Sequence, residues 1–427
     1  MSVTASQPKP AVTLQRPVII VLLGLLVVVA LVTTSPIAYW LMYALLSIVL
    51  LSYFWTRLAS RGLTIQRQIR TQWATVGDTI EEEFELRSRS RLPILMLEVE
   101  DYSELPGYRA SIAISLGSRG KRRWRTHGEA GRRGLYKLGP ADVTVGDPFG
   151  LFTAERRLAQ ENTIVVYPPI SVMHDVAVPA GTLVGAARSS MRTQQVTTDA
   201  GGLREFQPGD PLKRIHWPTS VRRETLLVKE FDLEPTASLW VALDLDAAVQ
   251  AGHGDESTEE YGVKIVSSLA YQFVRDGKSV GLLAEGRGTR YIIEPQRGLR
   301  QLWRILESLA IVQARGTQPF GDVLASAAPI LGRGVSLVAI SPSADPTWIA
   351  SLTHLAQRAV YPIAIGVDAA TFDDAPSNAG LKEGSETAGV SFTTVTQGAT
   401  FSTVQPSRHG GPAAEGQRRP TVSLAYQ

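Results

Sequence analysis

The chain has 427 residues, a formal net charge of +3 at pH 7 and no cysteine. The absence of thiols excludes a cysteine nucleophile, a thiolate zinc site and an iron–sulfur cluster. Nucleic acid is not expected as a partner, because such sites are strongly basic, whereas the most densely charged block of this chain, residues 204–234, has balanced signs.

Two apolar segments lie near the start of the chain. Residues 18–35 and 37–56 contain no charged side chain, and each is long enough to cross a hydrocarbon core of about 30 Å as a helix. After an N-terminal tail, residues 1–17, we therefore expect a transmembrane helical hairpin over residues 18–56, with its turn at Pro36. A cleaved signal peptide is the alternative for the first segment, but no small-residue cleavage site follows it.

Basic residues flank this hairpin on both sides, whereas its turn is uncharged. Lys9 and Arg16 precede it, and the residues that follow include Arg57, Arg61, Arg67 and Arg70. By the positive-inside rule, both ends of the hairpin should lie in the cytoplasm. The sequence therefore predicts a multi-pass protein of the cell inner membrane, in contact with the lipid bilayer, whose soluble domains are cytoplasmic.

Residues 61–168 contain short segments in which apolar and polar residues alternate. In the clearest case Ala110, Ile112, Ile114 and Leu116 alternate with Ser111, Ala113 and Ser115. A period of two with turn residues between the segments is typical of antiparallel strands that bury one face. We expect an antiparallel β-sandwich domain here, and no residue cluster in it resembles a catalytic site.

One part of this domain, residues 119–137, is strongly basic. It holds a single acid, Glu129, against eight basic residues: Arg119, Lys121, Arg122, Arg123, Arg125, Arg132, Arg133 and Lys137. Such a run could contact anionic lipid or an acidic partner. The alternative is a solvated hairpin whose alternate residues face water.

A second charged block follows a linker at residues 169–200, which is rich in Ser, Thr and Ala. Six basic and six acidic residues lie between Arg204 and Glu234. Balanced signs indicate either a structural clasp of paired charges or a partner-binding surface. The residues to which we assign this role are Arg204, Glu205, Asp210, Arg214, Trp217, Arg222, Lys229 and Glu230, with Trp217 as an apolar pin.

The order of motifs in this block resembles the signature of a bacterial family called domain of unknown function 58. The matching motifs are Arg204-Glu205-Phe206, Gly209-Asp210, Arg214-Ile215-His216-Trp217, Ser220-Val221-Arg222 and Leu227-Val228-Lys229-Glu230. A second stretch is similar to the same family: Arg133-Gly134-Leu135-Tyr136, then Asp147-Pro148-Phe149-Gly150-Leu151-Phe152. The resemblance covers roughly residues 15–370 and implies a membrane-anchored protein with a von Willebrand factor A-like domain.

Beyond the block, continuous apolar strands alternate with helical periodicity. Strands are predicted at residues 239–245, 280–284, 335–340 and 360–367, with helices between them that bury Val266, Trp303 and Leu352. This alternation predicts a doubly wound α/β domain, so that residues 201–367 comprise the signature block and the von Willebrand factor A-like domain. Residues 368–427 are expected to be a mostly disordered low-complexity tail, with one closing strand at residues 390–395.

The resemblance also implies a divalent-cation motif, Asp-x-Ser-x-Ser, after the first α/β strand. This chain has Asp244 and Asp246 at its first two positions but Ala248 at the last. Asp244 and Asp246 are the residues that could hold Mg²⁺. The alternative is that these acids cap a helix or pair with Arg204 or Arg222.

Two classes of function remain open at this point. The sequence offers no nucleophile–base pair and no paired histidines for zinc, which favours a non-enzymatic adaptor. The family resemblance suggests a MoxR-type AAA+ ATPase as the bound partner, alongside a transglutaminase-like membrane protein. The alternative is a metal-dependent enzyme that uses Asp244 and Asp246.

Overall fold

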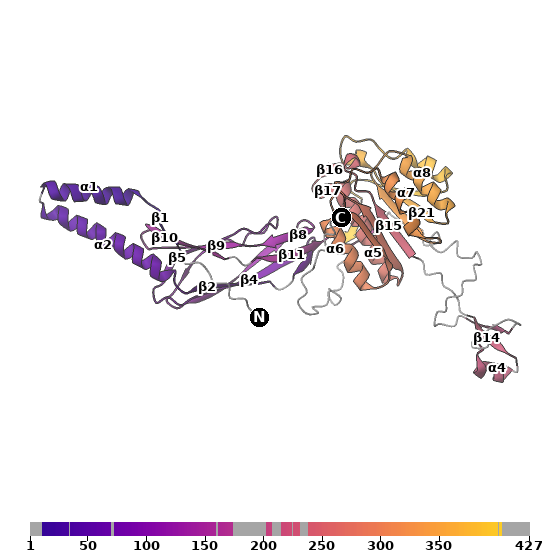
Figure 1. Ribbon diagram of the computed structural model, residues 1–427, viewed down its shortest axis with the longest axis horizontal. Coiled ribbons are helices and arrows are strands. Elements are labelled where there is room, and N and C mark those ends of the chain that lie inside the picture. The colour runs from indigo at the N-terminus through magenta and orange to yellow at the C-terminus, as the bar shows by residue number, and fades with distance from the viewer. Residues whose placement is uncertain are drawn as a thin grey trace. The chain divides into compact units, whose positions relative to one another are not determined.

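The computed structural model describes residues 11–33, 35–69, 72–158, 161–173, 202–206, 215–223, 225–230, 238–399 and 401–403 (Figure 1). The chain divides into two compact units, Met1–Pro168 and Pro169–Gln427.

The first unit begins with two apolar helices that pack against each other, α1 (Val18–Thr33) and α2 (Pro36–Ala59) (Figure 1). Pro36 occupies the first turn of α2, where a missing backbone N–H costs nothing. Among the described helices, only α2 is long and apolar enough to cross a membrane. Helix α1 is more apolar than α2, but its 16 residues are shorter than a typical span.

Strands of the β-sandwich form the rest of this unit. One sheet has the order β1-β10-β9-β5-β6, and two smaller sheets have the orders β2-β4-β7 and β3-β11-β8. The strands are β1 (Ala11–Leu14), β2 (Leu63–Ile69), β3 (Trp73–Thr75), β4 (Thr79–Ser88), β5 (Ile94–Asp101), β6 (Ile112–Leu116), β7 (Lys121–Glu129), β8 (Gly134–Leu138), β9 (Ala141–Gly146), β10 (Phe152–Leu158) and β11 (Asn162–Tyr167). Inward-facing residues such as Phe84, Leu97 and Val143 fill the core between the sheets, as the alternating pattern predicts.

Both ends of the helical hairpin attach to the same sheet of the sandwich. Strand β1, which precedes α1, pairs antiparallel with β10, and the Gln15 amide donates to the carbonyl of Leu151 at 2.8 Å. On the α2 side, the Thr56 hydroxyl donates to the carbonyl of Phe152 at 3.4 Å. The chain therefore leaves and re-enters the sandwich at one place.

The second unit is built on a six-stranded sheet with the order β19-β18-β15-β20-β21-β22. Its strands are β15 (Ser238–Leu243), β18 (Ser279–Glu285), β19 (Arg290–Gln296), β20 (Ser336–Ser341), β21 (Tyr361–Val367) and β22 (Ser391–Val395). All neighbours are parallel except the edge strand β19. The central strands are buried on both faces, which explains their continuous apolar sequence.

Helices cover both faces of this sheet (Figure 1). On one face α5 (Thr258–Arg275) and α6 (Leu299–Ile311) pack together, and Gly262 brings α5 so close that an added Cβ would lie 2.8 Å from Leu243. On the other face α7 (Phe320–Leu331) and α8 (Thr347–Gln357) enclose Trp348, whose ring lies 6.0 Å from Phe320 and 6.1 Å from Phe392.

The α/β domain extends past its predicted end at residue 367, and the closing strand predicted at residues 390–395 is present. Helix α9 (Leu381–Thr387) leads into β22, which adds the sixth strand next to β21. Small and polar residues dominate this segment, but the few large ones, Val390, Phe392 and Val395, are buried. Strand β23 (Phe401–Thr403) pairs with β12 (Ser171–Met173), and the rest of the expected tail, residues 404–427, lies outside the described residues.

The expected linker at residues 169–200 begins as packed structure. Ile170 is buried, the Ser171 amide donates to the Ser268 hydroxyl of α5 at 3.0 Å, and the Ser267 hydroxyl donates to the carbonyl of Pro169 at 2.7 Å. Residues 174–201 lie outside the described residues.

Candidate functional site

The candidate site lies at the carboxyl ends of two parallel neighbours, β15 and β20. Asp244 follows β15 directly and Ser341 ends β20, so the sheet brings together residues that are 97 positions apart. The Ser341 hydroxyl donates to Asp244 Oδ2 at 2.6 Å, and the Asp246 amide donates to Asp244 Oδ1 at 3.0 Å. Both carboxylate oxygens of Asp244 are therefore held by the protein.

Asp246 has a local structural role beside this pair. Its Oδ1 accepts a hydrogen bond from the Ala248 amide at 3.0 Å and caps a short 3₁₀ turn, Ala247–Val249. The predicted alternative for this residue, that it caps a helical turn, is thus the arrangement observed. The Gln250 side chain donates to the carbonyls of Asp244 and Asp246 at 3.2 and 3.3 Å, which closes the loop.

A second loop is fixed to the first at Gly316. The Gly316 amide donates to the carbonyl of Leu245 at 2.8 Å, and the Ala247 amide donates to the carbonyl of Gly316 at 3.0 Å. A Cβ at Gly316 would lie 2.8 Å from the Leu245 carbonyl oxygen, so only glycine allows this approach. Residues 244–251, 312–319 and 341–346 together form what we call the carboxyl-end rim.

Burial raises the pKa of Asp244 to about 6, although hydrogen bonds from Ser341 and Asp246 favour its charged form and partly offset this effect. The nearby charge of Asp246 adds to the increase. Only 3% of Asp244 is exposed. Burial of the ionised Asp244 carboxylate is thus unfavourable, and its two hydrogen-bond donors offset only part of the lost hydration.

The residues of the rim do not fit a Mg²⁺ site. Asp244 Oδ2 is occupied by the Ser341 hydroxyl and Asp246 Oδ1 by a backbone amide. Ala248 has no oxygen to offer in its side chain, and the described part of the chain holds no group of three or more His, Cys, Asp or Glu suited to a metal. Mg²⁺ is usually held by one or two carboxylates with waters completing its octahedron, and here both carboxylate oxygens of Asp244 and one of Asp246 already accept hydrogen bonds from the protein.

The described part of the charged block contains an antiparallel strand pair and a short helix. Strands β13 (Gly202–Glu205) and β14 (Leu227–Glu230) pair antiparallel, so that Arg204 faces Val228 and Glu205 faces Leu227 along the backbone. Helix α4 (Trp217–Arg223) lies between them in sequence and carries Arg222. Lys229 and Glu230 lie on β14, while Asp210 and Arg214 fall outside the described residues.

Ser220, and not the expected Trp217, links helix α4 to strand β14. Ser220 is buried, its hydroxyl accepts from the Leu227 amide at 2.9 Å and donates to the His216 carbonyl at 2.9 Å. Trp217 is 59% exposed, so it is not the apolar pin predicted from the sequence. His216 Nδ1 accepts from the Thr219 amide at 3.4 Å and helps to start α4.

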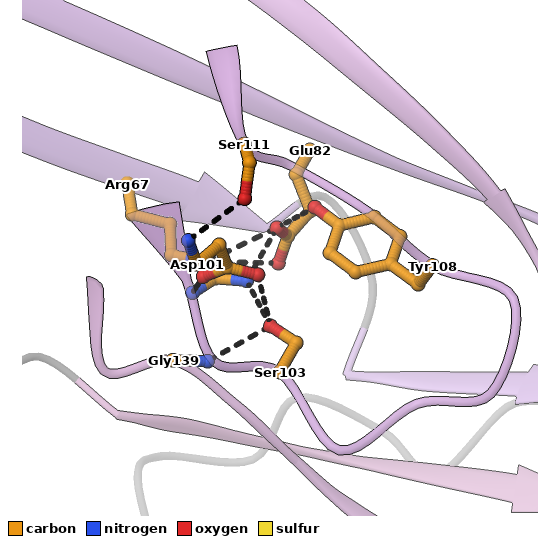
Figure 2. Close-up of polar contacts among 7 residues, drawn as sticks. All are labelled: Arg67, Glu82, Asp101, Ser103, Tyr108, Ser111 and Gly139. Carbon is orange, nitrogen blue, oxygen red and sulfur yellow. Dashed lines mark hydrogen bonds and ion pairs between the residues drawn. The ribbon is translucent and has the colours of Figure 1, made fainter. Parts of the chain in front are cut away.

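A buried ion cluster inside the sandwich was not predicted (Figure 2). Arg67 of β2 contacts Glu82 of β4 at 2.7 Å and Asp101 of β5 at 2.9 Å, and the Tyr108 hydroxyl donates to Glu82. Burial opposes the charge on Arg67, but its two carboxylate partners outweigh this effect and raise its pKa. Burial and the Glu82 hydrogen bond also raise the pKa of Tyr108.

This cluster is a structural lock rather than a reaction site. The side chains of Arg67 and Glu82 are 5% and 0% exposed, so no substrate reaches them in the described structure. Removing one partner of a buried pair typically costs about 3–5 kcal/mol, because it leaves an uncompensated charge. Ser103 completes the cluster by accepting from Arg67 at 3.1 Å and from the Gly139 amide at 3.0 Å.

The fold and the rim together define a multi-domain α/β protein with N-terminal apolar helices, β-sandwich sheets and a mixed, mostly parallel sheet. Residues 202–366 match the model of the family described as "Protein of unknown function DUF58", in agreement with the motifs of the charged block. A relative, "Uncharacterized protein YeaD" from Bacillus subtilis (strain 168), is 23% identical over 302 residues, which cover 66% of this chain and 71% of the relative.

Solved structures resemble only parts of the chain. The CARDB domain of the PF1109 protein from Pyrococcus furiosus is 13% identical, with a TM-score of 0.18, and the match covers 24% of this chain and 86% of that domain. The C-terminal domain of wzt is 11% identical, with a TM-score of 0.20, and covers 25% of this chain and 75% of that one. At these scores neither structure bears on function.

Proposed function

We propose that this protein is a non-enzymatic adaptor anchored in the inner membrane, whose cytoplasmic α/β domain is von Willebrand factor A-like and binds a partner protein at the carboxyl-end rim. The family resemblance suggests a MoxR-type AAA+ ATPase as that partner. The observation that carries the proposal is that Asp244 and Ser341 meet at the carboxyl ends of the neighbouring strands β15 and β20.

Numbered by their place in the sequence, the six strands lie in the order 3-2-1-4-5-6, with the third antiparallel. This is a doubly wound order, in which the chain reverses direction across the sheet between strands 1 and 4. Those strands are β15 and β20, whose ends carry Asp244 and Ser341. Open α/β sheets bind their ligands at this switch point, which supports the rim as the docking surface.

The anchor rests on the helical hairpin. Helix α2 has the length and composition of a membrane span. Because β1 pairs with β10, the chain before α1 and the chain after α2 lie on the same side. The surrounding arginines favour the cytoplasm as that side.

The proposal is tested by exchanging one charge at each end of the α/β sheet. Arg315 lies exposed in the rim, whereas Arg333 lies exposed before β20, at the opposite end of the strands. Full-length Arg315→Glu protein in nanodiscs should lose capture of the purified MoxR-type ATPase from the same genome, and Arg333→Glu protein should retain it. Both variants should unfold within about 0.5 kcal/mol of the wild type, as exposed substitutions usually do. Equal capture by both variants would remove the rim as the docking surface.

A further inference from the structure

The end of the sandwich from which the helical hairpin emerges has a distinctive composition. Four loops meet there, residues 60–62, 89–93, 117–120 and 147–151, and we call them the foot loops. Backbone hydrogen bonds join them: the Arg89 amide donates to Gly62 at 3.1 Å, and the Arg119 amide donates to Ser90 at 2.8 Å. The fourth loop is joined to the hairpin through Gln15 and Leu151 at 2.8 Å.

The charges in the foot loops are almost all positive. They contain four exposed arginines, Arg61, Arg89, Arg91 and Arg119. No carboxylate within the described residues pairs with any of them. The one acid in these loops, Asp147, is 3% exposed, and its carboxylate accepts the amides of Phe149 at 2.8 Å and Phe152 at 2.6 Å.

Large apolar side chains lie exposed between these charges. Phe149, in the loop that Asp147 organises, is 50% exposed. Met96 is 58% exposed. It pairs with Gly146, the residue directly before the same loop, and a Cβ added to Gly146 would lie 3.7 Å from it. Helix α1 begins at this place and carries no charged side chain, and helix α2 ends here with Arg57 in its last turn as its only charged residue.

We propose that the foot loops rest on the membrane surface, where the four arginines bind the phosphates of anionic phospholipids and Phe149 and Met96 enter the headgroup layer. This inference depends on the membrane anchor in the proposed function. A basic, aromatic-bearing ring at the base of an apolar helix is complementary to an anionic leaflet, which attracts each nearby Lys or Arg. The sandwich would then be held in a fixed orientation instead of moving freely on its hairpin.

Site-directed spin labelling of the full chain tests this contact, because the chain has no native cysteine. Labels would be placed at Ser118→Cys in the foot loops, at Leu46→Cys within α2 and at Arg132→Cys, between β7 and β8. In vesicles that contain phosphatidylglycerol, the Ser118 label should be shielded from a water-soluble nickel complex, and the Arg132 label should not. A Ser118 label as accessible as the Arg132 label, with Leu46 in lipid, would overturn this inference and leave the anchor intact. A Leu46 label in water would overturn both.

The lipid chemistry is tested with two matched triple variants, each of which removes three exposed positive charges. One is Arg89→Gln, Arg91→Gln and Arg119→Gln, and the other is Arg109→Gln, Arg125→Gln and Arg132→Gln. Spin-labelled lipids should report that the wild type prefers phosphatidylglycerol over phosphatidylcholine. The first variant should lower that preference, by up to roughly fivefold per arginine, and the second should keep it. Two results would contradict the proposal. If both variants lower the lipid preference equally, only the net charge of the protein matters. If neither variant lowers it, the arginines face an acidic protein and not lipid.

Discussion

Asp244 is the residue whose charge state links the rim to pH. In the unfolded chain its carboxyl group titrates near 3.8, whereas burial raises its folded pKa to about 6. Between these values the folded state binds the proton more strongly. Its contribution to stability is therefore present at low pH and is lost as pH rises through about 6.

We expect the free energy of unfolding of the α/β domain to fall by roughly 2–3 kcal/mol from this residue alone as pH rises from about 4 to 7, because each unit of difference between its folded and unfolded pKa corresponds to about 1.4 kcal/mol. In Asp244→Asn this part of the pH dependence should be absent, because the amide keeps a neutral group beside Ser341. Hydrogen-exchange protection of the β15 amides, corrected for the intrinsic effect of pH, measures the difference. Parallel pH profiles for the two proteins would contradict it.

The buried ion cluster around Arg67 was not predicted, although the sequence carries a signal for it. Leu63, Ile65 and Ile69 lie on one face of β2, and the same period of two places Arg67 on that face. Glu82 likewise lies between Ile80 and Phe84 on the inward face of β4. Two opposite charges at inward positions of neighbouring strands are a detectable signal of a buried pair.

At the scale of elements, the charged block depends on one serine. Ser220→Ala removes the acceptor of the Leu227 amide, and leaving a buried donor unpaired costs about 1–3 kcal/mol. Trp217→Ala should change local stability by less than about 0.5 kcal/mol, because the indole is mostly exposed. Hydrogen exchange of the segment that contains β14 should accelerate in the first variant only. Faster hydrogen exchange in Trp217→Ala would mean that the tryptophan stabilises the block after all, as the structural clasp predicts.

Sequence periodicity predicted most elements of both units, because strands and helices that bury one face carry a clear pattern. Helices α5, α6 and α8 and the central strands follow from their apolar positions. Strand β22 was predicted as a closing strand, but helix α9 was hidden in a tail of small residues. The Asp244–Ser341 pair depends on which strands are neighbours. A single chain's local pattern does not specify strand order, so that contact could not be predicted.

At the scale of the whole molecule, the pairing of β1 with β10 restricts how the hairpin can sit in a membrane. The strand before α1 and the sandwich after α2 are hydrogen-bonded. A chain anchored as proposed would therefore cross the bilayer an even number of times or return from within it. Helix α1 is about 24 Å long at 1.5 Å per residue. A complete crossing by α1 would need local thinning of the bilayer or help from flanking residues.

A topology reporter tests this arrangement. A reporter that is active only outside the cytoplasm should be silent when fused after Gln427, and equally silent when fused before Met1, because the β1–β10 pair holds both flanks of the hairpin on one side. An N-terminal fusion that is active while the C-terminal fusion is silent would mean that α2 crosses alone and that β1 does not pair with β10 in the membrane.

The same pairing has a consequence for how the protein is made. Thr13 of β1 and Thr153 of β10 are 140 residues apart, so at a synthesis rate of about 5–20 residues per second β1 leaves the ribosome roughly 7–28 s before its partner. In a protein anchored as proposed, the hairpin therefore meets the membrane while its first strand is still unpaired. The pairing of β1 with β10 at the edge of the sheet therefore forms late. It can form only after α2 has returned the chain to the side of the membrane on which the ribosome lies.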